Sequence, residues 1–345
     1  MSSEDPSPPR EGQRLALYRL LLGLAGRIPD SEMAHLRMGL ADDERGEMAD
    51  RLAAMIGSGQ CDPAVAEHEA VRDLLEREGR SAPSYPVAVP AARQYRFAGG
   101  RFDADPELVE GEQLRHKPAD RAVVEAVCRV GETIAIWRVY RGGDGPASDR
   151  VYLCEARSGA DVVEMTAEAQ FALEEIGEKP ARVEIFHEDE LCITDYHDQA
   201  LAAAVLLWAA DTVPVRLARV FDGAQESGPY FTDDHHRLTG PDREQVLTYL
   251  RSATPVLGSL GRMDDVVRPE RVANVPVDFR SDRVWVWTEA VAYYLAEYDL
   301  APEPDLISHI LGGPPPIRTL GRFDRQRVTA ALFAPAEKEP VWQAG

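Results

Sequence analysis

A chain of 345 residues, 44% of them hydrophobic, is long enough to form two or three domains, each with its own core. Its formal net charge is −21 at pH 7. Such an acid excess argues against nucleic acids and anionic membranes as partners, because proteins bind both through basic surfaces. It favours solubility and permits electrostatic attraction of a basic protein.

Cysteine usage and terminal composition indicate a cytoplasmic protein. The first 12 residues are acidic and proline-rich, unlike a signal peptide, and the longest apolar run, 200–210, is about half of what a bilayer requires. Phosphate-binding loops and standard catalytic motifs are absent from the sequence, so we expect no cofactor. The cysteines are widely spaced and are expected to be unpaired. They are Cys61, Cys128, Cys154 and Cys192.

The N-terminal part of the chain is predicted to be helical. Residues 1–12 are polar and rich in proline, as in a disordered tail. In the helical module that follows, 13–80, apolar residues recur at helical spacing, and Asp30 stands where it can cap the second of four helices. Residues 81–117 are rich in proline and glycine, and we interpret them as a linker containing at most one short strand.

Residues 118–222 alternate between helical and strand patterns and predict a mixed α/β domain. Two β-rich runs joined by Gly142–Pro146 predict a hairpin. Phe171 and Ile176 are expected among the apolar residues of their helix. The predicted elements are helices over 118–130, 161–176 and 195–210 and strands over 133–140, 150–155, 182–186 and 213–221.

The C-terminal module, 223–335, is predicted to be smaller and also α+β. Trp285 and Trp287 alternate along a short strand and therefore point to one face, with Tyr294 of the next helix expected to pack nearby. The chain after Gly312 is rich in proline and predicted to be irregular, ending in a tail at 336–345. The fold class is therefore α+β, with a helical N-terminal module, a central mixed α/β sheet domain and this C-terminal module.

One C-terminal segment carries a family resemblance. It reads Asp278-Phe-Arg-Ser-Asp-Arg-Val-Trp-Val-Trp-Thr-Glu-Ala-Val-Ala-Tyr-Tyr-Leu295. It resembles a segment of uncharacterised actinobacterial multi-module proteins, some of which look like immunity partners of secreted toxins. The resemblance implies an accessory or immunity role and carries over no catalytic residue.

Two groups of polar residues are candidates for catalysis or metal binding. A metal needs three or four converging ligands, and neither group has a standard zinc spacing. A cysteine nucleophile needs a base within hydrogen-bonding distance. We interpret both groups as ordinary structural residues and expect no metal site. The groups are His187, Cys192, His197 and Asp198, and Asp233, Asp234, His235 and His236.

The clearest departure from average composition is acidity between Ala160 and Asp211, where thirteen acidic residues stand against Lys179 and Arg182. One interpretation is a solvated helix face. The other is a surface that binds a basic protein, because a cluster of like charges is best tolerated when opposite charge covers it. The residues predicted to bind the partner are Glu174, Glu175, Glu188, Asp189, Glu190, Asp195 and Asp198.

The leading functional hypothesis is therefore a non-catalytic, immunity-like or scaffold-like role in which this acidic protein binds or neutralises a basic protein. The alternative is an enzyme of unrecognised class, with a cleft between the central and C-terminal modules. Its candidate residues are the second polar group, Asp233–His236.

Overall fold

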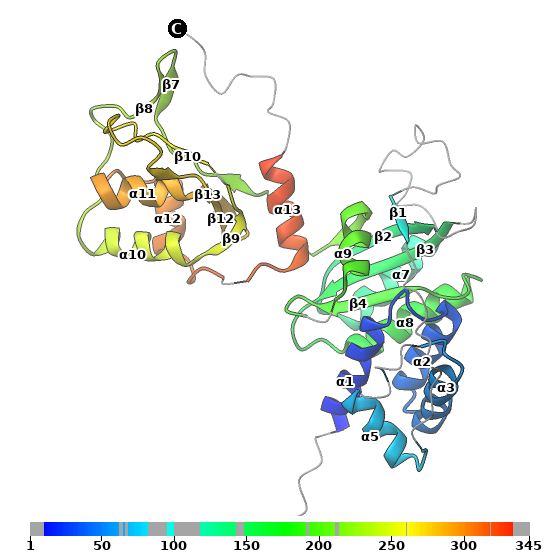
Figure 1. Cartoon of the computed structure of the whole chain (residues 1–345). Helices are drawn as coiled ribbons and strands as arrows, with labels where there is room; N and C mark the ends of the chain where they lie inside the picture. The colour runs from blue at the N-terminus through cyan, green and yellow to red at the C-terminus, as the bar shows by residue number, and fades with distance from the viewer. Residues whose placement is uncertain are drawn as a thin grey trace, which may run out of the picture. The chain divides into compact units, whose positions relative to one another are not determined.

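The computed structural model describes residues 10–61, 65, 68–81, 95–99, 118–142, 148–190, 193–210, 214–259, 261–317 and 319–333. The chain divides into two compact units, Met1–Asp211 (unit 1) and Thr212–Gly345 (unit 2), and each is described by itself (Figure 1). Both units combine helices with a mixed sheet, so the predicted α+β class is confirmed. The boundaries predicted between modules stay predictions.

Some predictions concern residues outside the described ranges. They are the tail 336–345, most of the tail 1–12 and of the linker 81–117, the hairpin turn after Gly142, and Cys192. Among the described cysteines, Cys128 and Cys154 are free thiols, as predicted for them.

Unit 1 is built on a sheet of strand order β1-β2-β3-β4, in which β5 also pairs with β2. The predicted hairpin forms its centre: β2 (Thr133–Gly142) pairs antiparallel with β3 (Ser148–Ala156). β4 (Val183–His187) pairs parallel with β3. On the side away from β3, β2 pairs with two strands. Its C-terminal end pairs with β1 (Arg96–Ala98), and its middle pairs with β5 (Val205–Ala209).

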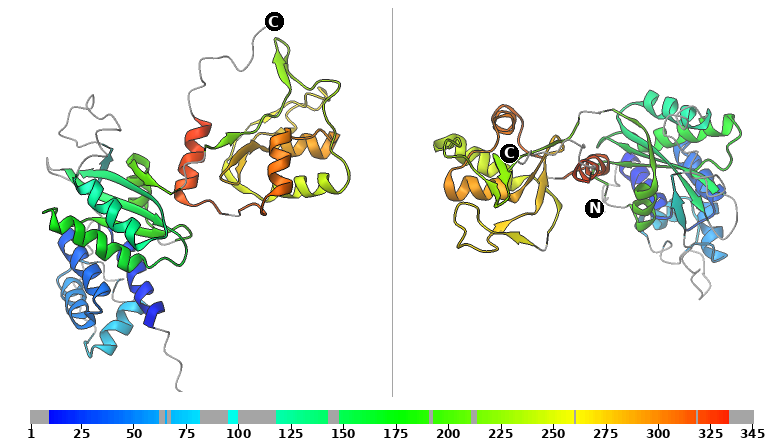
Figure 2. Two further views of the ribbon diagram at one scale, coloured as in Figure 1. Left: turned by 180° about the vertical axis from the view of Figure 1, so that it is seen from behind. Right: turned by 90° about the horizontal axis from the view of Figure 1, so that it is seen from above.

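Helices cover both faces of this sheet (Figure 2). α7 (Pro118–Val130) and α8 (Val162–Glu175) pack against each other on one face. α9 (Asp195–Ala203) lies on the other. The evidence is in β4, where successive side chains point to opposite faces. The ring of His187 hydrogen-bonds to the carbonyl of Ala160, two residues before α8. The ring of its neighbour Phe186 contacts the ring of His197 in α9.

Four further helices lie beside the β4 edge of the sheet (Figure 1). They occur where apolar residues recur at helical spacing, as predicted, but the first begins at Arg10, so residues 10–12 are helical and not part of a tail. The helices are α1 (Arg10–Gly23), α2 (Asp30–Ala41), α3 (Arg45–Gly57) and α5 (Glu69–Arg77).

Two side chains of these helices bind the free backbone of β4. The hydroxyl of Tyr18 donates to the carbonyl of Ile185 at 2.7 Å, and the guanidinium of Arg37 donates to the carbonyl of Val183. Both carbonyls face away from β3. An open strand edge would otherwise template pairing with another chain. The helices therefore seal the β4 edge.

A network of charged side chains also joins α2 to the sheet. Asp30 was predicted to cap α2, but Pro29 holds the N-cap position and Asp30 is the first helical residue. Its carboxylate instead accepts hydrogen bonds from Arg141 of β2 and from Arg182, the latter at 2.6 Å. Asp149 pairs with both arginines at 2.9 Å. Each carboxylate is thus shared between two guanidinium groups.

The predicted helix over 195–210 is wrong in its second half. α9 ends at Ala203, and Val205–Ala209 is the strand β5. This run, Val-Leu-Leu-Trp-Ala, is apolar and can be read as either element from its pattern alone. The run forms a strand because it pairs with the side of β2 that faces away from β3. This pairing satisfies backbone groups that the end of a helix would leave free.

Unit 2 contains a sheet of order β6-β13-β12-β9 and two small hairpins, of which β7–β8 projects from the unit (Figure 1). Its helices are α10 (Gly240–Ser252), α11 (Glu289–Tyr298), α12 (Pro304–Gly312) and α13 (Arg322–Leu332). Its strands are β6 (Arg216–Leu217), β7 (Gly223–Gln225), β8 (Gly228–Tyr230), β9 (Thr254–Leu257), β10 (Arg262–Met263), β11 (Val275–Pro276), β12 (Phe279–Ser281) and β13 (Trp285–Thr288).

Two predictions for this part of the chain are wrong. The strand predicted over 213–221, an edge strand because of Pro214, does lie at a sheet edge, but only as the short β6, which pairs parallel with β13 in unit 2 and not with the central sheet. Its neighbour Pro214 has no N–H to extend the ladder. The region after Gly312 is not wholly irregular, because α13 forms there. The buried residues of α13, Phe323 and Val328, are five positions apart. This spacing gives a weak helical pattern, and the prolines before it led to the prediction of an irregular segment.

The two tryptophans of β13 lie in the main core of unit 2, as their alternation predicted. Trp287 is 1% exposed and its indole N–H donates to the carbonyl of Leu250, and Trp285 is 4% exposed. Tyr294 is not part of this cluster. It packs in a second one against the rings of Phe221 and Phe231, on the other side of its helix.

We expect the substitution Trp285→Ala to lower the free energy of unfolding of unit 2 by about 3–5 kcal/mol, because it leaves a cavity in a closed core. Calorimetry of the full chain measures this loss. The matched control is Phe333→Ala, which removes an exposed ring and should change stability little. A loss under about 1 kcal/mol at Trp285 would contradict its place in the core.

The carboxylate of Asp30 should make unit 1 sensitive to acid. Partial burial alone would raise the pKa of Asp30, but hydrogen bonds and charge from Arg141 and Arg182 outweigh burial and hold it below the ordinary value. Its stabilising contribution is therefore present above about pH 4 and is lost as the pH falls through its folded-state pKa. Asp30→Asn should cost about 1–3 kcal/mol at neutral pH and flatten the acid limb of urea unfolding measured against pH. An unchanged acid limb would contradict this role.

Candidate functional site

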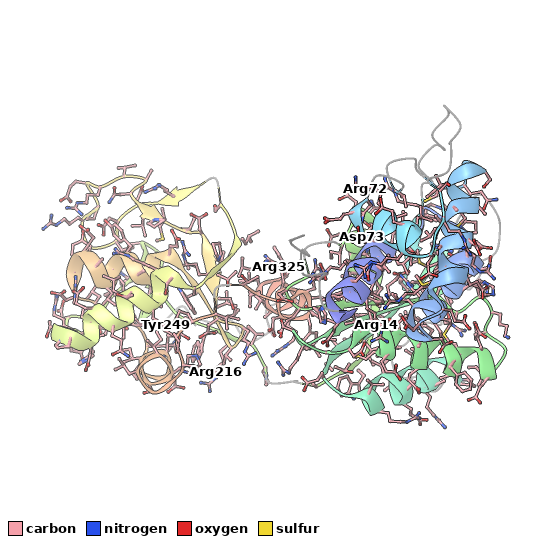
Figure 3. The ribbon with its side chains drawn as sticks, turned by 90° about the horizontal axis from the view of Figure 1, so that it is seen from below. Arg14, Arg72, Asp73, Arg216, Tyr249 and Arg325 are labelled. Carbon is pink, nitrogen blue, oxygen red and sulfur yellow. The ribbon has the colours of Figure 1, made fainter. Side chains whose placement is uncertain are left out.

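The candidate site lies on the outer surface of α8, which combines glutamates with an exposed aromatic ring. It begins at Asp161, whose carboxylate caps the helix by accepting from the backbone N–H groups of Val163 and Glu164 at 3.1 and 3.0 Å. Arg14 of α1, labelled in Figure 3, pairs with the same carboxylate at 2.8 Å. The inner face of α8 is buried, so its start and its orientation are both fixed.

The outer face of α8 is acidic with an aromatic ring in its middle. The helix contains four glutamates and no lysine or arginine. Glu164, Glu168, Phe171 and Glu175 follow a spacing of four, three and four residues, which places them within an arc of about 60° along one stripe. We call these four residues the acidic α8 face. Phe171 is 55% exposed, although the sequence predicted it among the apolar residues that pack inward.

The charges of this face agree only in part with the preferences of a helix, since the helix dipole favours the negative charge of Glu164 in the first turn. Glu164 and Glu168 are four residues apart, where like charges repel. Glu175 lies in the last turn, where the helix dipole disfavours negative charge. Compensation is slight: Arg129 of α7 approaches Glu168 at 3.6 Å, and this pair is largely exposed. No ion pair of Glu164 or Glu175 occurs within the part of the chain that the structure describes.

The seven acidic residues predicted to bind a partner do not form one continuous belt. Glu174 and Glu175 end α8, whereas Glu188 and Asp189 follow β4. Because α8 connects two parallel strands, it runs opposite to β4, and its 14 residues span about 21 Å. The two groups therefore lie towards opposite ends of the sheet.

The remaining three predicted residues differ from one another. Glu190 is buried, 4% exposed, and pairs with Arg19 at 2.9 Å, so its charge is already compensated within the chain. Asp195 and Asp198 are exposed in the first turn of α9, on the face of the sheet opposite α8. The structure thus places Glu175 on one stripe with an aromatic ring that the sequence did not single out, whereas Glu174 lies beside this stripe and pairs with Lys179 at 3.4 Å. The sequence did contain a signal for this face, because Phe171 stands three residues after Glu168 and four before Glu175.

The first polar group does not converge. His187 Nε2 lies 2.9 Å from the carbonyl oxygen of Ala160, and His197 Nδ1 accepts from the N–H of Thr194 on the other face of the sheet. Cys192 lies outside the described residues. Among those that are described, no three His, Cys, Asp or Glu side chains are arranged to hold a metal ion.

The second polar group lines a cavity of about 260 Å³ in unit 2, to which Asp234, His235 and His236 contribute and Asp233 does not. His235 is engaged at both nitrogens, with Nδ1 2.8 Å from Asp222 and Nε2 3.0 Å from the carbonyl of Ala301. A general base needs a free nitrogen. The cavity is also smaller than the usual 300–1,000 Å³ of small-molecule sites. This arrangement fits a structural role for His235.

A larger cavity of about 570 Å³ lies between α10 and Gly313–Pro316. Tyr249, labelled in Figure 3, lines it but directs its hydroxyl to Asp282 at 2.8 Å. His309 Nε2 approaches the same carboxylate at 2.7 Å. Burial and then the Asp282 charge raise the pKa of Tyr249, so its hydroxyl stays protonated. The described lining thus combines the Glu244 carboxylate with neutral hydrogen-bonding groups, and Tyr249 is not activated as a nucleophile.

Comparison with known proteins identifies no relative, since no family model, curated protein or solved structure matches the chain. The resemblance of Asp278–Leu295 to immunity partners stays a prediction. Within the described residues, every helix is too short or too polar to span a bilayer. The acidic α8 face is therefore the candidate site, because it combines negative charge with an exposed aromatic ring.

Removal of one charge from this face should stabilise the protein. Glu175→Gln takes a negative charge from the last turn of α8, and we expect the free energy of unfolding of unit 1 to rise by about 0.3–1 kcal/mol at low ionic strength. Calorimetry at low and high salt measures the gain, which salt should reduce. Glu226→Gln changes an exposed glutamate outside any helix and is the control. A destabilised Glu175→Gln variant would contradict the view that this charge is unfavourable.

Proposed function

We propose that this chain is a non-catalytic interaction protein that binds a basic protein partner through the acidic α8 face. The role is immunity-like or scaffold-like, and we expect it in the cytoplasm. The observation that carries the proposal is Phe171, a ring 55% exposed between glutamates on a helix without any basic residue. A solvated helix face needs the charges but has no use for the ring.

The ring and the charges serve different steps of binding. Aromatic side chains are enriched among the residues that dominate interface energy, because their burial removes a large apolar area from water. Carboxylates around them raise the association rate of a basic partner. Glu188, Asp189, Asp195 and Asp198 are too far from Phe171 to touch the same small element, but they extend the negative field that attracts it.

The polar groups of unit 2 favour this proposal over the enzyme alternative. His235 is held at both nitrogens, and Asp282 is saturated by hydrogen bonds from Tyr249, His309 and two backbone N–H groups. Groups fixed in this way support the fold. By contrast, Glu164 and Glu175 are exposed, and Glu175 stands where the helix dipole disfavours its charge, which is typical of residues retained for binding.

The test uses the full chain as bait in an extract of the cells that produce it. We expect the wild type to retain a basic protein that the variant Glu164→Gln/Glu168→Gln/Glu175→Gln loses. With the retained protein purified, the variant should associate more slowly and with a flatter salt dependence, because screening acts on the removed charges.

The control variant, Glu76→Gln/Glu226→Gln/Glu270→Gln, makes the same change of net charge at exposed glutamates elsewhere. It should bind like the wild type. Equal capture by all three proteins, with each of them folded by circular dichroism, would overturn the proposed site. Loss of capture by both variants would reduce the effect to net charge and overturn it as well.

A further inference from the structure

We infer that the element docking on the acidic α8 face is a basic amphipathic α-helix of about 12 residues. The inference rests on the proposed function and adds the kind of structure that the partner presents. It follows from what the surface offers: helix side chains, one apolar ring and carboxylates on either side of that ring.

An extended segment has no backbone to pair with at this place. Strand addition needs an open sheet edge. The edge nearest to α8 is that of β4, where Tyr18 and Arg37 occupy the carbonyls of Ile185 and Val183. The middle of a helix exposes no free backbone donors or acceptors, since each is bonded within the helix. Recognition must therefore use side chains, as one helix does when it packs on another.

The stripe sets the length and pattern of the partner. From Glu164 to Glu175 the helix rises about 17 Å, which corresponds to about 12 residues of a second helix. An apolar residue near its centre covers Phe171. Arginine or lysine residues about one turn to either side then face Glu168 and Glu175, in the i, i+3 or i+4 relation that brings helical side chains onto one face.

A contact of this type exists within unit 1. Arg129, on the neighbouring helix α7, reaches Glu168 at 3.6 Å across the surface of the helix layer. A guanidinium carried by a packed helix can therefore meet a carboxylate of this face. Glu164 lies before Glu168 on the stripe and Glu175 after it, so a helix along the stripe meets charges that Arg129 leaves without a partner within the described residues.

The experiment uses two synthetic 14-residue peptides of identical leucine and lysine composition. In one, leucines recur every three to four residues and form a helical stripe; in the other, the order is scrambled so that no stripe forms. Binding of each fluorescent peptide to the full chain is measured by anisotropy at low and physiological salt, and helix formation by circular dichroism. The protein variants are Phe171→Ala, the three-glutamine variant of the acidic α8 face and, as a matched control, Phe333→Ala.

We expect the striped peptide to bind and become helical, with at least tenfold weaker binding to Phe171→Ala and unchanged binding to Phe333→Ala. Equal affinity of both peptides, unchanged by Phe171→Ala but weakened by the glutamine variant, would overturn the helical partner and leave the proposed function intact. Absence of binding by both peptides, or binding that the glutamine variant does not weaken, would overturn the inference together with the proposed site.

Discussion

The architecture of unit 1 depends on closing one strand edge. β4 is the last strand of the sheet. Its outward carbonyls could pair with a strand of another chain if Tyr18 and Arg37 did not bind them. Arg37 is buried and needs a counter-charge, which Glu184 supplies. Burial alone would raise the pKa of Glu184, but Arg37 and then His197 outweigh it and keep this carboxylate ionised. Sealing the edge thus required a buried ion pair between the helices and the sheet.

The same arrangement explains why the outer face of α8 is free. Thr166, on the buried side of α8, hydrogen-bonds to the Tyr18 hydroxyl that binds β4, and Gln170 donates to the backbone of α2. The helices that close the edge therefore hold α8 from its inner side. Its remaining stripe faces solvent within the described part of unit 1.

The carboxylates of the acidic α8 face differ from those that the fold uses, such as Asp30 in unit 1. In unit 2, Asp265 is buried and accepts from Tyr293, Tyr298 and two backbone N–H groups. Asp222 accepts from Thr232 and lies against His235. These carboxylates organise loops. Within the described residues, the acidic α8 face makes one long ion pair, between Glu168 and Arg129, and this contrast sets its carboxylates apart more clearly than net charge does.

Local pattern was enough to predict many elements but not the contacts that select among them. The helix Pro118–Val130 was predicted at its observed bounds, because proline opens it and its apolar spacing is regular. Val205–Ala209 was misread because its partner β2 lies some 70 residues away in sequence. Aspartate is a common helix cap, so the sequence predicted that role for Asp30. Its actual partners, Arg141 and Arg182, come close to it only in the folded structure.

The candidate site was predicted in part for the same reason. Acidity near Glu174 is visible in composition, so two residues at the end of α8 were identified. The exposure of Phe171 depends on which side of α8 meets α7, α2 and the sheet, and periodicity alone does not orient a helix with apolar residues on more than one side. Glu164 and Glu168 become meaningful only once that orientation is known.

The sealed edge has a consequence for how the chain matures during synthesis. Arg37 and the carbonyl it binds are separated by 146 residues, a stretch that takes roughly 7–30 seconds to translate. Throughout this interval the N-terminal helices have emerged without the strand that they close, and their apolar sides remain available to chaperones or to neighbouring nascent chains. When β4 appears, the helices that close its edge are already present, so this edge can be covered as soon as β4 joins the sheet.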